Sequence, residues 1–306
     1  MMRALYSLAT IAAQPLLRRK LRRRGEAEPG YLEAVEERFG RYHEPAEPGA
    51  LWIHAVSLGE TRAAAILVQA LREKEPGLRL LLTHGTATGR AEGARLLRPG
   101  DAQSWLPWDT PGAVARFLAH FRPRAGVLME TEVWPNLSAA CAREGVPLAL
   151  ANARLSEKSL RQALRLAPLS RPAYRALASA WAQTEADAQR LRALGAPVRG
   201  VFGNLKFDAR PDPEQLARGL LWQPRAGGPV VMFASSREGE EAPFLEAVTR
   251  LRGRGIRWLL VPRHPQRFDE VAQLAQARGL SVARRSAWGE GGPREEDQAA
   301  DLWLGD

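Results

Sequence analysis

The sequence predicts an α/β protein in which parallel strands alternate with helices. Short, uncharged apolar runs recur along the chain, and each is followed by a stretch with helical periodicity. Gly and hydroxyl residues stand between the two kinds of segment, where the chain must turn. Most of the apolar runs lack a polar alternation, which is typical of strands buried on both faces of a parallel sheet.

Composition limits the possible classes of protein. A chain of 306 residues suggests two domains, and a hydrophobic content of 45% excludes global disorder. The single cysteine, Cys141, excludes a disulfide framework and a cysteine-rich metal site, and its helical surroundings indicate a small packed thiol. A net charge of +10 and a pI of about 10.6 favour anionic partners, such as nucleic acid, anionic lipid or a phosphorylated substrate.

The N-terminal segment combines an apolar run with a basic cluster. The run spans 5–17 and is shorter than the roughly 20 residues of a membrane-spanning helix. The cluster, 18–24, follows the run, which is the wrong order for a signal peptide but suits a helix lying on an anionic membrane surface. The alternative is a helix packed on the domain with a solvated basic end. A second, charged amphipathic helix is predicted over 31–42, ending at Gly40.

From Leu51 onward the strand and helix patterns alternate. The first strand, 51–53, leads through Ser57-Leu58-Gly59 into a helix that starts near Glu60 and runs to about Lys74. The further strands are predicted at 78–83, 125–129, 146–151, 179–183 and 198–202, and a short strand with a loop is predicted over 104–109. Helices are predicted at 90–97, 111–120, 134–144, 157–175 and 185–194.

A second alternation follows a break rich in Pro, Gly and charge. Residues 207–228 are predicted to be a linker with one short helix. The expected domains are therefore a helical N-terminal segment (1–48), a first Rossmann-like domain (49–206), the linker, and a second, partial domain (229–306). In the second domain, strands are predicted at 229–234, 256–261, 280–284 and from 302, with helices at 240–253 and 268–278.

Charged residues follow several predicted strands. In open α/β sheets the ligand crevice lies at the carboxyl ends of the strands, so these residues are candidates for one site. Two carboxylates in one site allow one to act as a base while the other holds charge. For each residue alone, a surface ion pair or a helix-start charge is the alternative. The candidates are Glu60, Glu130 with Glu132, Lys206, and Arg263 with His264.

Several long motifs in one order resemble the bacterial 3-deoxy-D-manno-octulosonic acid (Kdo) transferases of lipopolysaccharide assembly. They are LWIHAVSLGE, METEVWPNL, ANARLS, GNLKFD, ASSREGEE and PRHPQRF. The resemblance implies a GT-B fold, with two Rossmann-like domains facing a cleft. It also implies transfer of Kdo from CMP-Kdo to a hydroxyl of the lipid A precursor. Because the sequence has no HExxH motif and no carboxylate cage, we expect no metal and no cofactor.

The resemblance also implies roles for individual residues. The family's catalytic base corresponds to Glu60, its transition-state stabilisers to Glu130 and Lys206, and its CMP contact to Pro262 and Arg263. The expected location is the cytoplasmic face of the inner membrane. Family members continue with a glycine-rich nucleotide loop and an Asn-Leu-Glu-Pro-like motif, so the second domain is expected to be incomplete in this chain.

Two other functions are weighed against this one. Another GT-B enzyme, such as a sugar-nucleotide epimerase, would lack the membrane-facing segment and would release a free UDP-sugar. A non-catalytic nucleic-acid-binding protein is supported only by the basic cluster, which has no interleaved aromatic residues for base stacking. We therefore expect no nucleic-acid partner.

Overall fold

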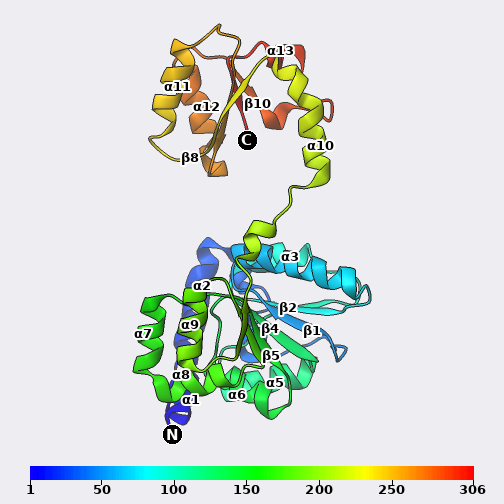
Figure 1. Cartoon of the computed structure of the whole chain (residues 1–306), viewed down its shortest axis with the longest axis vertical. Helices are drawn as coiled ribbons and strands as arrows, with labels where there is room; N and C mark the ends of the chain where they lie inside the picture. Colours follow the sequence, from blue (N-terminus) through cyan, green and yellow to red (C-terminus); the bar gives the residue numbers. More distant parts are fainter. The chain divides into compact units, whose positions relative to one another are not determined.

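The computed structural model describes all residues, 1–306, and divides into two compact units, Met1–Ala209 and Arg210–Asp306. Each unit contains one sheet in which every strand pairing is parallel, with helices packed around it (Figure 1). The predicted α/β class is confirmed. The division falls near the start of the expected linker, and no helix reaches the length and apolarity that crossing a bilayer requires.

The sheet of the first unit has seven strands in the order β3-β2-β1-β4-β5-β6-β7. The order reverses between β1 and β4, which pair directly, with Leu51 opposite Ala125. This reversal is the topological switch point of an open α/β sheet, where ligands bind at the carboxyl ends of the strands. The strands are β1 (Leu51–His54), β2 (Leu80–His84), β3 (Ala102–Trp105), β4 (Ala125–Met129), β5 (Leu148–Ala153), β6 (Ser179–Ala182) and β7 (Val198–Val201).

The helices of the first unit mostly begin at caps that the sequence provides. Ser57, Thr86, Thr110, Ser156 and Thr184 each accept a hydrogen bond from a backbone N–H in the first turn of the helix that follows. The α-helices are α1 (Met2–Ala12), α2 (Gln14–Ala27), α3 (Leu58–Lys74), α4 (Ala87–Ala94), α5 (Pro111–Phe121), α6 (Pro135–Arg143), α7 (Glu157–Arg165), α8 (Ala167–Arg175) and α9 (Glu185–Leu194), and the 3₁₀ turns are η1 (Pro29–Leu32), η2 (Val35–Phe39) and η3 (Leu205–Asp208).

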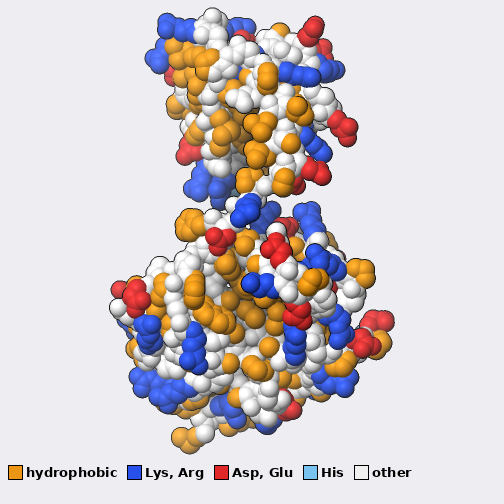
Figure 2. Space-filling view, turned by 45° about the vertical axis from the view of Figure 1, so that its right-hand side comes forward, with side chains coloured by type: hydrophobic (Ala, Val, Ile, Leu, Met, Phe, Trp, Pro, Cys, Tyr) orange, Lys and Arg blue, Asp and Glu red, His pale blue; other side chains and the backbone are white.

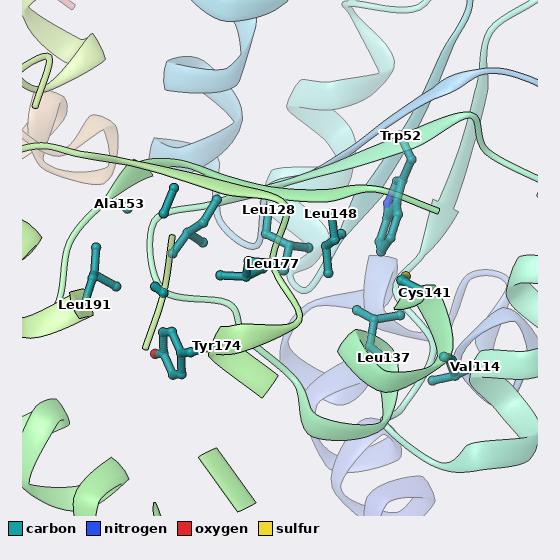
Figure 3. Packing of buried hydrophobic residues seen from close by; sticks show 14 of the residues in the cluster. Trp52, Val114, Leu128, Leu137, Cys141, Leu148, Ala153, Tyr174, Leu177 and Leu191 are labelled. Atoms are coloured by element: carbon teal, nitrogen blue, oxygen red, sulfur yellow. The ribbon is translucent and has the colours of Figure 1, made fainter. Parts of the chain in front are cut away.

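Alternate residues of the central strands feed two apolar clusters on opposite faces of this sheet. Trp52 and Leu128 belong to one cluster, and Ile53 and Met129 to the other. Figure 3 shows Trp52, Leu128 and Leu148 projecting toward the helical residues Leu137 and Cys141. Cys141 is a buried thiol. Both faces of the strands are thus covered, and only the strand ends and their loops remain for a site.

The second unit has a four-stranded parallel sheet in the order β10-β11-β9-β8. Leu245, Leu260 and Val271 lie in its main core cluster. The elements are α10 (Pro213–Trp222), η4 (Gln223–Ala226), β8 (Val230–Ser236), α11 (Glu241–Arg250), β9 (Arg257–Pro262), η5 (Pro265–Arg267), α12 (Phe268–Gln276), β10 (Val282–Arg284), η6 (Arg285–Ala287), α13 (Glu295–Gln298) and β11 (Leu302–Leu304).

The helix predicted over 31–42 is wrong. The structure forms η1 and η2 there, separated at Ala34, whose φ of 45° is left-handed and incompatible with a continuous helix. Tertiary contacts decide this conformation: Tyr31 stacks on Trp105 with ring centroids 6.3 Å apart, and the indole N–H of Trp105 donates to the carbonyl of Glu33.

Two further predictions need correction. The helix predicted from 157 to 175 is broken at Leu166 into α7 and α8, because Pro168 lies in the first turn of α8 and cannot continue the preceding helix. Helix α4 begins at Ala87, three residues earlier than predicted, because Thr86 caps it.

The first helix packs on the unit through its polar side. The Ser7 hydroxyl donates to Oδ1 of Asn136 at 3.0 Å, and the Thr10 hydroxyl donates to the carbonyl of Asp109 at 3.4 Å. Leu5, Leu8 and Ile11 face solvent instead, with 56%, 64% and 48% of their surface exposed. In the basic cluster, Arg18 is held by Glu36, whereas Arg19 to Arg24 remain exposed except for Leu21.

Candidate active site

Glu60 lies at the switch point, in the first turn of α3 after β1. Its carboxylate accepts hydrogen bonds from the backbone N–H of Val56 at 2.9 Å and from the Ser57 hydroxyl at 3.1 Å, while the Ser57 hydroxyl accepts from the Glu60 N–H. Ser57 thus caps α3, and the two hydrogen bonds that the Glu60 carboxylate accepts fix it in place. Burial raises the pKa of Glu60, and the neighbouring charge of Glu130 raises it further. The hydrogen bonds from Val56 and Ser57 lower the pKa but do not cancel this increase.

Glu130 directly follows β4, the strand beside β1, and its side chain is buried. Its backbone has φ of 58°, a left-handed conformation that non-glycine residues rarely adopt. The carboxylate is 2.7 Å from Nε of Arg154 and 3.8 Å from Nζ of Lys206, and both cations are more than half exposed. A buried negative charge is therefore held between two cations that retain access to solvent.

Glu132 completes a cluster of carboxylates. Burial raises its pKa to about 7, and the charges of Glu60 and Glu130 add to the effect. No cation lies within ion-pair distance of Glu132, in contrast to Glu130. The site therefore carries a proton that exchanges near neutral pH, next to the carboxylate predicted to act as the base.

The end of β5 links the carboxylates to Lys206. Asn152, with φ of 51°, accepts a hydrogen bond at its side-chain oxygen from the N–H of Leu205, the residue before Lys206. Sequence reasoning placed residues 152–156 in a loop and did not select Asn152 or Arg154. The strand β5 extends two residues beyond the predicted end at 151, so Asn152 lies in its last part and Arg154 directly follows it. Both residues follow the predicted strand 146–151, so the criterion that selected Glu60 and Glu130 would have found them.

The structure brings Glu60, Glu130, Glu132 and Lys206 together at the carboxyl edge of the first sheet. Pro262 and Arg263 belong to the other unit, where Pro262 ends β9 and is buried. The Arg263 N–H donates to the carbonyl of Ser236 at 3.0 Å, and its side chain is exposed. Beside it, the buried carboxylate of Glu241 accepts from the Ser236 hydroxyl and pairs with Arg267 at 2.7 Å.

A parallel sheet with a cluster of carboxylates and two cations at its switch point is typical of an α/β protein that binds a ligand at the strand ends. The family model described as 3-deoxy-D-manno-octulosonic-acid transferase (kdotransferase) matches residues 33–209. The chain belongs to this family, and it is accordingly a Kdo-transferring glycosyltransferase of lipopolysaccharide biosynthesis.

Named relatives agree with this assignment. The chain is 49% identical to the 3-deoxy-D-manno-octulosonic acid transferase of Bordetella pertussis, over 99% of the chain and 73% of that protein. It is 30% identical to the enzyme of the same name from Haemophilus influenzae, over 94% of the chain and 69% of that protein. Among solved structures it is similar to the UDP-GlcNAc 2-epimerase of Neisseria meningitidis, at 14% identity and a TM-score of 0.48, over 74% of the chain and 69% of that structure.

Proposed function

We propose that the chain transfers Kdo from CMP-Kdo to the lipid A precursor lipid IVA, with Glu60 as the general base. The observation that carries this proposal is the Glu60 carboxylate, fixed at the switch point with a raised pKa. A raised pKa makes the carboxylate a stronger base near neutral pH, where general-base catalysis needs it.

The proposed reaction is a displacement at the anomeric carbon of Kdo. The acceptor hydroxyl loses its proton to Glu60 and attacks from the face opposite CMP, which inverts that carbon. The bond to the CMP phosphate breaks through an oxocarbenium-like state, as in other glycosyl transfers. Because the phosphate departs as a stable anion, no strong general acid is required.

Glu130 and Lys206 are proposed to stabilise this transition state. The buried Glu130 carboxylate suits the positive charge that develops on the sugar ring. Lys206 is half exposed, so its ammonium has donors available for the Kdo carboxylate or for the departing phosphate. Arg263, after Pro262 in the second unit, is proposed to hold the CMP phosphate through its exposed guanidinium.

The enzyme assay compares wild type with Glu60→Gln, using CMP-Kdo and lipid IVA. We expect a 10²- to 10⁴-fold loss of turnover, the usual contribution of a general base. The Ser57 cap uses the backbone N–H of residue 60, and glutamine keeps the size of the side chain and one acceptor oxygen, so the melting temperature should be unchanged. Glu73→Gln, an exposed change on the same helix, is the control and should retain full turnover. A Glu60→Gln enzyme with more than a tenth of wild-type turnover contradicts the base assignment, and a wild type that transfers no Kdo contradicts the substrates.

We also propose that α1 and α2 hold the enzyme on the cytoplasmic face of the inner membrane. The exposed stripe of Leu5, Leu8 and Ile11 lies on the side of α1 that faces away from the unit, next to the basic residues of α2. On the face drawn in Figure 2, Lys and Arg side chains are likewise interspersed with apolar surface.

Flotation with anionic vesicles tests this membrane contact. Leu8→Ser should lower the vesicle-bound fraction roughly tenfold, because one leucine side chain no longer enters the apolar layer. Leu220→Ser on α10 is the matched control, since the two leucines are similarly exposed, at 64% and 60%. Equal losses for the two variants would remove the proposed role of α1.

A further inference from the structure

Arg38 is a buried cation without a carboxylate partner. Only 3% of its surface is exposed, and its guanidinium lies 3.7 Å from the ring centroid of Trp105. The adjacent carboxylate of Glu37 pairs with Arg90 instead. Of its five N–H donors, one from Nη2 reaches the carbonyl of Gly85 at 3.1 Å, and the buried Nε has no acceptor.

Two other arginines of this unit have more partners within the protein than Arg38 has. The buried Arg72 bonds the carbonyl of Leu96 and pairs with the carboxylate of Asp101, although its Nε, like that of Arg38, has no acceptor. Arg116 donates to the carbonyls of Phe39 and Gly40 at 2.7 and 3.0 Å. Burying an uncompensated charge is costly, so the open donors of Arg38 point to an anion that the protein itself does not supply.

The guanidinium lies at the loop that opens α4. The N–H groups of Gly85 and Thr86 both donate to the carbonyl of Val56, whose own N–H donates to Glu60. A single residue, Val56, therefore links the loop bonded to Arg38 to the carboxylate of Glu60. Gly89 is required in this loop, because a Cβ there would lie 2.8 Å from the Val56 carbonyl oxygen.

The start of α4 adds donors of its own. The N–H groups of Ala87 and Thr88 have no acceptor, and the hydroxyl of the exposed Thr88 lies 3.4 Å from that of Thr86. Free N–H groups and the helix dipole make a helix N-terminus favourable for phosphate. Arg24 adds a further cation 5.2 Å from the ring of Tyr31, which itself stacks on Trp105.

We propose that Arg38 and the N-terminus of α4 bind a phosphate monoester of the acceptor glycolipid and so place its hydroxyl beside Glu60. This inference rests on the proposed function, because it assumes that the acceptor is a phosphorylated lipid A precursor. A guanidinium fork and two backbone N–H groups match the oxygens of a terminal phosphate.

Acceptor binding tests this proposal without requiring turnover. The dissociation constants of lipid IVA and of phosphatase-treated lipid IVA are measured in a nonionic detergent, which excludes phospholipid headgroups. Wild type should bind the dephosphorylated form at least tenfold more weakly, the usual contribution of a charged hydrogen bond. Arg38→Gln should bind both forms equally, Arg38→Lys should recover part of the difference, and inorganic phosphate should compete only with the phosphorylated form.

The controls separate the possible sources of phosphate. Arg116→Gln removes an arginine that bonds only carbonyls and should keep the wild-type preference. The affinity for CMP should be the same in wild type and in Arg38→Gln, and a loss there would assign the phosphate to the nucleotide and overturn the proposal. A wild type that binds both acceptor forms equally overturns it as well, even if Kdo transfer is observed and the proposed function stands.

Discussion

The buried carboxylates at the strand ends of the two sheets differ in whether neighbouring residues neutralise their charge. At the second sheet, the buried carboxylate of Glu241 is matched by the Ser236 hydroxyl and by Arg267. At the first sheet, Glu60, Glu130 and Glu132 share one site with two half-exposed cations, and Glu132 has none of its own. One edge is neutralised by its own residues, whereas the other carries excess negative charge.

This difference indicates what each edge contributes. A neutralised carboxylate ties together the strand and helix that frame Arg263, so it supports the fold of the second unit. Excess negative charge costs stability, but it provides a group, Glu132, that exchanges a proton near neutral pH, as general acid–base catalysis requires. If this comparison holds, substitutions at the first edge should change activity and pH dependence, while those at the second edge should change stability.

The largest stability effect is expected for Glu241→Ala. The change removes the acceptor of the buried Ser236 hydroxyl and the buried partner of Arg267, which should lower the opening free energy of the second unit by about 3 kcal/mol. Hydrogen exchange of the β9 amides measures it. Glu270→Ala removes the other, exposed partner of Arg267 and should have a much smaller effect, because solvent screens that pair. Equal effects of the two changes would mean that burial of Glu241 is unimportant.

A smaller, pH-dependent effect is expected for Glu132. Its pKa is about 7 in the folded protein, above the usual 4.5, so the folded state holds the proton more tightly than the unfolded state does. Stability contributed by this group is present at low pH and is lost as the pH rises from about 4.5 through 7. Glu132→Gln should remove up to about 3 kcal/mol of the decrease in unfolding free energy between pH 5 and pH 8.

Urea unfolding at the two pH values measures this change, with Glu73→Gln as the control. If Glu132→Gln and wild type lose stability in parallel as the pH rises, then Glu132 is not the group that titrates, and the contrast between the two edges is weaker than described.

The smallest effect is expected for Ser57→Ala. Loss of the cap of α3 should lower the unfolding free energy by about 1 kcal/mol. Ser156→Ala removes the equivalent cap of α7 and should cost a similar amount. Only Ser57→Ala should also lower Kdo transfer, because the Ser57 hydroxyl donates to the Glu60 carboxylate. Equal activity in the two variants would show that this hydrogen bond does not position the base.

Local patterns in the sequence predicted much of this arrangement. The strands β1 and β4 are uncharged runs followed by Glu60 and Glu130, so the period of the apolar residues alone placed both carboxylates at strand ends. That these two strands are neighbours depends on the order of the sheet, which no local pattern encodes. The resemblance to a known family supplied that information.

The remaining residues depend on contacts between distant parts of the chain. Arg38 lay inside a predicted helix, and its importance comes from Trp105 and Gly85, which are far along the sequence. The helix itself was predicted wrongly because stacking of Tyr31 on Trp105 outweighs a modest local helix preference. Arg154 would look like an ordinary loop residue without its pairing to Glu130.

The backbone of Glu130 and of Asn152 carries a consequence for the engineering of this enzyme. Both residues hold positive φ at the ends of neighbouring strands, which costs roughly 1 kcal/mol or more for each residue with a Cβ. Glycine at position 130 would remove that cost together with a buried charge. Selection for heat resistance alone would therefore reward the loss of this carboxylate, so a thermostabilised variant should be chosen on turnover as well as on melting temperature.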